Sequence, residues 1–143
     1  MSSTPTIHLI GAPTDVGASV RGAGMGPDAL RVADLPATLA RHGFGVVDAG
    51  NLDWPATSWT APSNGLRHLD EVVAWNRALY SAVDGALNAG HVPLLMGGDH
   101  CLAVGSISAV ARHARARGQQ LRVIWLDAHS DVNTEATSPS GNL

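Results

Sequence analysis

The sequence contains no lysine, only one cysteine and no apolar run long enough to span a bilayer. The single cysteine, Cys101, excludes an internal disulfide and is typical of a reducing compartment. The N-terminal residues Met1-Ser2-Ser3-Thr4-Pro5 lack the basic and then apolar order of a signal peptide. These absences predict a cytoplasmic protein with no membrane-spanning segment.

The sequence has no excess of positive charge that would indicate a polyanionic partner. All nine basic residues are arginine, and the formal net charge is -3. We therefore predict no binding to nucleic acid or to an anionic membrane surface. The 143 residues suffice for one domain with a hydrophobic core.

Short apolar runs alternate with segments of helical periodicity along the chain. The sequence predicts strands at 6–10, 45–50, 92–96 and 123–126, and helices beginning near Pro27 and Pro36 and spanning 69–88 and 102–117. Because the apolar runs do not alternate with polar residues, we predict an α/β fold with a parallel sheet covered by helices on both faces. Ligands of such sheets bind beyond the carboxyl ends of the strands.

A glycine-rich loop, residues 11–26, follows the first predicted strand. No Gly-Lys-Ser/Thr follows it, and its spacing is not Gly-x-Gly-x-x-Gly. We interpret it as a connector that allows close backbone packing, in preference to a phosphate-binding loop.

The sequence Asp127-Ala128-His129-Ser130-Asp131 follows the fourth predicted strand. Alternate residues of an extended chain point the same way, so Asp127, His129 and Asp131 could converge on one cation. The same pattern fits a strand end with solvated carboxylates and a hydrogen-bonded histidine. This motif alone does not decide between the two interpretations.

His100 is a second polar signal at the same edge of the predicted sheet. It follows the third strand through Gly97-Gly98-Asp99, where two glycines allow a sharp turn. A lone histidine after a strand is more often structural than metal-binding. Together with the later cluster it favours a metal site, which raises His100 to a predicted ligand.

The residues after this cluster are polar and read as a loop over it. Its hydroxyls and amides could bind a polar head group such as an amino-acid carboxylate, although an ordinary Ser/Thr loop has the same composition.

These motifs resemble the ureohydrolase superfamily, and the arginase family most closely. The resemblance rests on Gly97-Gly98-Asp99-His100, on Asp127-Ala128-His129-Ser130-Asp131, on Asn133-Thr134 and on Ser140-Gly141-Asn142-Leu143. It runs over essentially the whole chain in matching order. It implies an arginase-like three-layer α/β/α fold that is incomplete here, with residues 1–143 as the N-terminal half of a single ureohydrolase domain.

The resemblance also implies a function in arginine metabolism. Arginases hydrolyse L-arginine to L-ornithine and urea with two Mn²⁺ ions per complete site. The implied metal ligands are His100, Asp127, His129 and Asp131, and Asp131 would also orient the attacking hydroxide as the catalytic residue. The implied substrate-binding residues are His129, Asn133, Ser138, Ser140 and Asn142. Family members are commonly homo-oligomers, trimers or hexamers, when full length.

Part of the family's site has no counterpart in this sequence. The family has an Asp-x-Asp pair on a later strand, and a histidine that would follow Leu143. In the family's sheet, two further strands separate the third strand from the fourth. We therefore expect this chain to be a truncated portion that is inactive by itself.

Two alternatives stay open. The chain could belong to an agmatinase or a formimidoylglutamase of the same superfamily, which use the same metals on a different amidine. It could also be a non-catalytic fragment that associates with a full-length partner.

Overall fold

A computed structural model describes residues 4–18, 20–53, 66–134 and 136–142. The strands are β1 (Thr6–Gly11), β2 (Gly45–Asn51) and β3 (Val92–Met96). The α-helices are α1 (Gly26–Val32), α2 (Leu35–Arg41), α3 (Leu69–Asn88) and α4 (Ala103–Ala116), and the 3₁₀ turns are η1 (Ala23–Met25) and η2 (His100–Leu102). The first three predicted strands and all four predicted helices are confirmed, with bounds shifted by a few residues at most.

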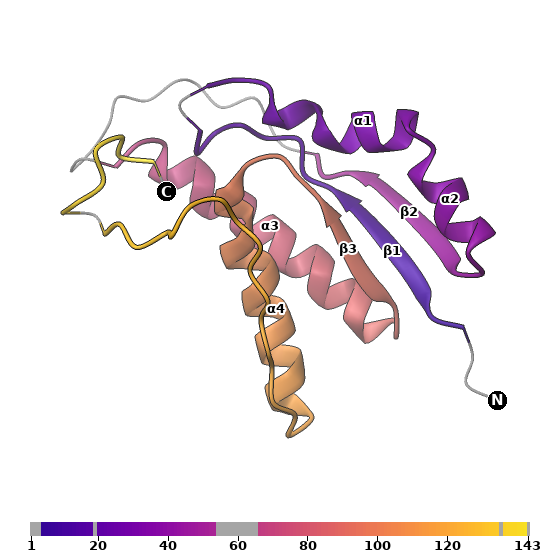
Figure 1. The fold of residues 1–143 in the computed structure, drawn as a ribbon. Helices are drawn as coiled ribbons and strands as arrows, with labels where there is room; N and C mark the ends of the chain where they lie inside the picture. The colour runs from indigo at the N-terminus through magenta and orange to yellow at the C-terminus, as the bar shows by residue number, and fades with distance from the viewer. Residues whose placement is uncertain (1–3, 19, 54–65, 135, 143) are drawn as a thin grey trace.

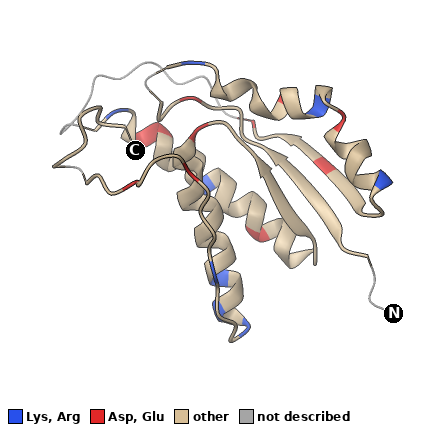
Figure 2. Ribbon diagram, viewed as in Figure 1, with Lys and Arg blue, Asp and Glu red and all other residues tan. Residues whose placement is uncertain are grey.

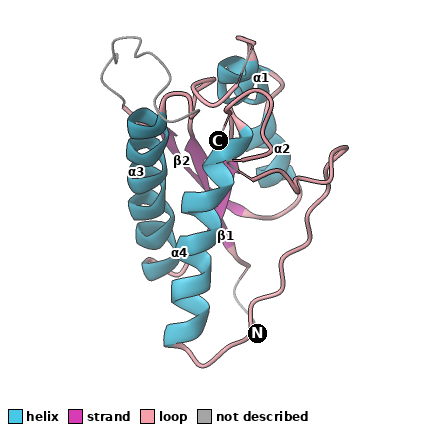
Figure 3. Ribbon diagram, turned by 90° about the vertical axis from the view of Figure 1, so that its left-hand side faces the viewer, coloured by secondary structure: helices cyan, strands magenta, loops and turns pink. Residues whose placement is uncertain are grey.

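The three strands form a parallel sheet in the order β2-β1-β3. Helices α1 and α2 lie on one face, and α3 and α4 lie side by side on the other (Figures 1 and 3). Successive residues of β1 point to opposite faces of the sheet and so supply both cores. Leu9 packs towards α2, and Ile10 packs towards α3. The predicted parallel α/β sheet with helices on both faces is confirmed.

Helix α3 is buried along one stripe, as its periodicity predicts. The buried members of that stripe are Val72, Trp75, Leu79, Val83 and Ala86. Its contact with α4 is close at Gly105, whose N–H donates to Asn76 Oδ1 at 2.6 Å. A Cβ on Gly105 would clash with the backbone carbonyl of Asn76, so only glycine allows this approach.

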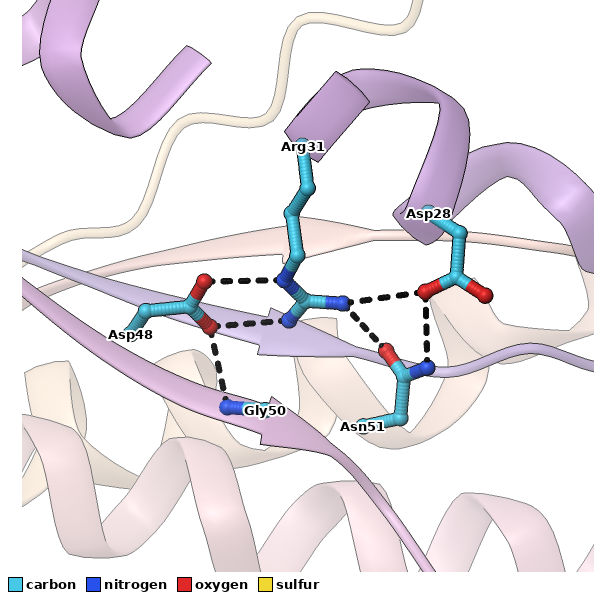
Figure 4. Close-up of polar contacts among 5 residues, drawn as sticks. All are labelled: Asp28, Arg31, Asp48, Gly50 and Asn51. Atoms are coloured by element: carbon cyan, nitrogen blue, oxygen red, sulfur yellow. Dashed lines mark hydrogen bonds and ion pairs between the residues drawn. The ribbon is translucent and has the colours of Figure 1, made fainter. Parts of the chain in front are cut away.

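A polar network joins α1 to the end of β2 (Figure 4). Arg31 donates to both oxygens of Asp48, from Nε and Nη2, at 2.8 Å each. Its Nη1 donates to Asn51 Oδ1 at 2.6 Å, and Asn51 Nδ2 donates to Asp28 Oδ1 at 3.1 Å. The hydrogen bonds from Arg31 lower the pKa of Asp48, and those to Asp48 raise the pKa of Arg31.

The prediction of a fourth strand at 123–126 is wrong. Residues 119–134, here called the extended segment, form no helix or strand, and within them Ile124 is 78% and Leu126 94% exposed. A strand needs a hydrogen-bonded neighbour, and β3 pairs with β1 on one side only among the described residues. The apolar run has no partner strand within the part of the chain that the structure describes.

Among the described residues, no helix combines the length and the apolar character that a membrane crossing requires.

Candidate metal centre

His100 is held at the carboxyl end of β3 by the turn that follows the strand. Gly98 has a φ of 97°, and a Cβ there would clash with the carbonyl oxygen of Ala12 at the end of β1. Asp99 Oδ1 then accepts a hydrogen bond from the Cys101 N–H at 2.8 Å and caps η2. The predicted position of His100, at the edge of the sheet, is confirmed.

Two carboxylates of the extended segment face this histidine. Asp127 Oδ2 lies 3.3 Å from His100 Nδ1, and Asp131 Oδ2 lies 3.6 Å from His100 Nε2. One ligand atom from each of the three residues lies within 4.8 Å of the other two. The side chains are 49%, 20% and 38% exposed for His100, Asp127 and Asp131, so an ion would keep access to water.

His129 stands outside this trio. Its side chain is 85% exposed, and its Nδ1 lies 3.3 Å from Asp127 Oδ1, whereas His100 meets Oδ2 of the same carboxylate. We predicted that Asp127, His129 and Asp131 converge on one point, and in the structure only the two aspartates do so. Ala128 and His129 lie in a bend, so the alternation of an extended strand is already broken between Asp127 and Asp131.

Each of the two carboxylates accepts a hydrogen bond from a neighbouring residue of the extended segment. The His129 N–H donates to Asp127 Oδ1 at 2.8 Å, and this bond is the largest cause that lowers the pKa of Asp127. Trp125 Nε1 donates to Asp131 Oδ2 at 2.9 Å, and its ring meets the His100 imidazole edge-on at 5.1 Å. Sequence reasoning missed Trp125, which it interpreted only as part of an apolar strand.

Charge is unevenly distributed over the molecule (Figure 2). Acidic segments gather where β1 and β3 end, and basic segments lie at the far end of α4 and also in α1, in α2 and in the loop that follows β1.

A cavity of about 590 Å³ opens beside the trio. His100 and Asp131 line one side, and the predicted substrate residues Asn133, Ser138, Ser140 and Asn142 line another. The structure therefore brings together every predicted site residue except Asp127 and His129 on this one cavity. Leu143 of the Ser-Gly-Asn-Leu motif lies outside the described residues.

The glycine-rich loop supplies the remaining wall. Gly17, Ala18 and Val20 line the cavity, and Gly17 packs so closely on Asp99 that a Cβ would lie 2.6 Å from Oδ1. Sequence reasoning interpreted this loop as a connector and missed its part in the cavity. The available signal was its position, because it follows β1 and so lies at the same sheet edge as His100.

The chemistry of the trio suits a divalent cation. Two carboxylates and one imidazole are oxygen and nitrogen ligands of the type that Mn²⁺ accepts. The three described ligands, with water, fit one ion.

The chain is similar to known proteins over nearly its whole length. The chain matches the Arginase family over residues 5–143. It is 43% identical to an arginase of Brevibacillus brevis over 137 residues, which are 96% of this chain and 45% of that protein. It superposes on the native arginase of Bacillus caldovelox with a TM-score of 0.86 at 40% identity, over 98% of this chain and 46% of the other.

A more distant structural match is a variant of the formiminoglutamase of Trypanosoma cruzi, solved with Mn²⁺. Its TM-score is 0.53 at 26% identity, over 75% of this chain and 35% of the other. The chain spans about half the length of the curated relatives that it matches. Because the family match extends over nearly the whole of its own length, the chain belongs to the arginase family.

Proposed function

We propose that this protein serves the hydrolysis of L-arginine to L-ornithine and urea, as a part of a dimanganese centre and of the adjoining substrate site. The observation that carries the proposal is the meeting of His100, Asp127 and Asp131 beside a cavity lined with hydroxyls and amides. Residues 1–143 would be the N-terminal half of a single ureohydrolase domain.

The positions of the site residues suggest a role for each in the proposed reaction. His100, Asp127 and Asp131 would hold metal, and His129 would bind the second ion beside Asp127. Bound manganese lowers the pKa of water, which supplies a nucleophile near neutral pH. Asp131 would accept a hydrogen bond from that water and aim it at the guanidinium carbon.

The polar wall of the cavity would bind the other end of the substrate. Asn133, Ser138 and Ser140 present an amide and two hydroxyls, which suit an α-carboxylate, with Asn142 next to them. His129 would contact the substrate near the reacting end. The cavity volume is in the range of small-molecule sites.

The comparisons favour arginine over other amidines as the substrate. The arginase of Bacillus caldovelox matches 98% of the chain, whereas the formiminoglutamase matches 75% with a much lower TM-score. The formiminoglutamase variant was solved with Mn²⁺, which supports manganese as the metal.

We also propose that the 143 residues alone release no urea. Three described ligands fit one ion, the His129 side chain is almost fully exposed, and the extended segment packs loosely. A dimanganese centre needs more protein ligands than these residues provide.

The test is urea release by the protein purified from its natural source, with its intact mass recorded in the same preparation. A species of 14.7 kDa, the mass of these residues, is expected to release none with Mn²⁺. A heavier product that contains them is expected to release urea from L-arginine and not from agmatine. Release from agmatine alone, or manganese-dependent turnover at 14.7 kDa, would contradict the respective proposal.

A second candidate, a non-catalytic fragment that binds a partner chain, is favoured by one observation. The run 123–126 exposes large apolar side chains beside a strand edge that no described strand covers. Size-exclusion chromatography of the same preparation, with mass identification of any companion, separates the two candidates.

A further inference from the structure

The tail that lines the cavity is held by a residue far away in the sequence. The Arg67 N–H donates to the Gly141 carbonyl oxygen at 2.9 Å. Its guanidinium Nη1 donates to Asn142 Oδ1 at 3.3 Å, across 75 residues of sequence. A backbone bond and a side-chain bond from one residue therefore fix two consecutive residues of the tail, residues 136–142.

Arg67 is itself held by the start of α3. His68 follows it with a φ of 52°, and its carbonyl accepts the first helical hydrogen bond from Val72 at 2.9 Å. The His68 Nδ1 lies 2.9 Å from Glu71 Oε2, and Glu71 is buried. The tail is thus tied to the rigid end of a packed helix.

Movement of the anchored residues would move both serine hydroxyls of the cavity wall. The Gly141 N–H donates to Ser138 Oγ, and the Asn142 N–H donates to Ser140 Oγ, each at 3.2 Å. Gly141 is buried and has a φ of 68°, a conformation that glycine adopts without strain. The two residues that Arg67 holds are therefore the ones that orient Ser138 and Ser140.

We propose that Arg67 is a positioning residue that sets the place of the Ser138 and Ser140 hydroxyls and so the recognition of the substrate's carboxylate. This role rests on the proposed function of the cavity as an arginine site. Arg67 acts through Gly141 and Asn142, and metal binding by the trio does not depend on it.

The first measurement needs no ligand. Hydrogen exchange of the tail amides is compared in the protein, in Arg67→Met and in the matched control Arg77→Met. Arg77 is exposed on α3, the helix that begins two residues after Arg67. Arg67→Met removes the guanidinium bond to Asn142 and keeps the backbone bond to Gly141. It is therefore expected to speed exchange at Asn142 about fivefold, while the amides of α3 keep their rates. Unchanged tail exchange in Arg67→Met would overturn the proposal.

The second measurement separates positioning from a general loss of structure. Calorimetry with Mn²⁺ present compares L-arginine with agmatine, which has the same guanidinium and no carboxylate. Arg67→Met is expected to weaken L-arginine about fivefold and agmatine less than twofold, and Arg67→Lys is expected to restore part of the loss. Equal weakening of both ligands would overturn the positioning role.

The two measurements test two different proposals, so one can be contradicted while the other stands. If the unmodified protein binds L-arginine no better than agmatine, carboxylate recognition in the cavity is wrong. The exchange data then still decide whether Arg67 holds the tail.

Discussion

The described residues from 4 to 118 and the extended segment, residues 119–134, differ sharply in packing. In the first region, the layered region, Leu9 and Leu79 are fully buried. In the extended segment Leu126 is 94% exposed, although its local sequence is as apolar as that of β3. Apolar composition favours burial, but burial also requires a surface to pack against.

The predicted metal ligands come from both regions, and their backbones are therefore held in different ways. His100 comes from the layered region, where a strand, a glycine turn and a helical cap fix its backbone. Asp127 and Asp131 come from the extended segment, where local hydrogen bonds and their approach to His100 orient them. The centre therefore has one rigid ligand and two ligands on a less supported chain.

The largest effect is expected when a leucine is replaced by alanine in each of the two regions. Leu79→Ala removes a fully buried side chain from the α3 core and is expected to lower the free energy of unfolding by about 3 kcal/mol. Leu126→Ala removes a solvated side chain and is expected to change it by less than about 0.5 kcal/mol. Urea denaturation measures both, and similar losses would show that the extended segment is packed in solution.

A second test concerns the packing inside the layered region. Gly105→Ala puts a Cβ against the Asn76 carbonyl, so we expect a loss of about 2 kcal/mol in the free energy of unfolding. The control is Gly85→Ala on the exposed side of α3, where a Cβ meets nothing within 4 Å. That change is expected to stabilise by about 0.5 kcal/mol through helix propensity. Equal effects in thermal melts would contradict the close approach of α3 and α4.

The same contrast explains what the sequence could predict about the fold. The helix at 69–88 and the strand at 92–96 were predicted with the observed bounds, because their periodicity and their glycine ends are local signals. The strand at 123–126 was wrong, because strand formation depends on a neighbour that no local pattern specifies.

The candidate site follows the same rule. The meeting of His100 with Asp127 and Asp131 was predicted from the rule that strand ends share one edge of a parallel sheet. The convergence of His129 depended on continued extension of the chain, and the bend at Ala128 and His129 removed it. The roles of Trp125 and Arg67 depend on tertiary contacts, which sequence spacing does not reveal.

A third test asks whether a metal ion reduces the difference between the regions. Titration with Mn²⁺ is expected to slow hydrogen exchange at 127–131, because an ion held by His100 and both aspartates ties the extended segment to the layered region. Asp131→Asn and His100→Ala are each expected to weaken Mn²⁺ binding about tenfold or more. EDTA should reverse the protection.

The control for the metal titration is His113→Ala near the far end of α4, which should leave Mn²⁺ affinity unchanged. Protection that survives in His100→Ala would mean that the extended segment is ordered without the ion.

The smallest expected effect concerns two arginine–aspartate pairs within the layered region. Asp48 meets Arg31 through two hydrogen bonds and is 30% exposed, whereas Asp34 and Arg41 are 61% and 64% exposed. The pKa of Asp48 is lowered in the folded state, so its stabilising contribution is present above the unfolded value of 3.8. That contribution is lost as the pH falls through the lower, folded pKa.

Asp48→Asn should therefore cost about 1 kcal/mol at pH 7 and progressively less below pH about 4, while Asp34→Asn should cost under about 0.5 kcal/mol at any pH. Urea denaturation of both variants across this pH range measures the difference, and a pH-independent cost for Asp48→Asn would mean that the side chain acts through packing instead of charge.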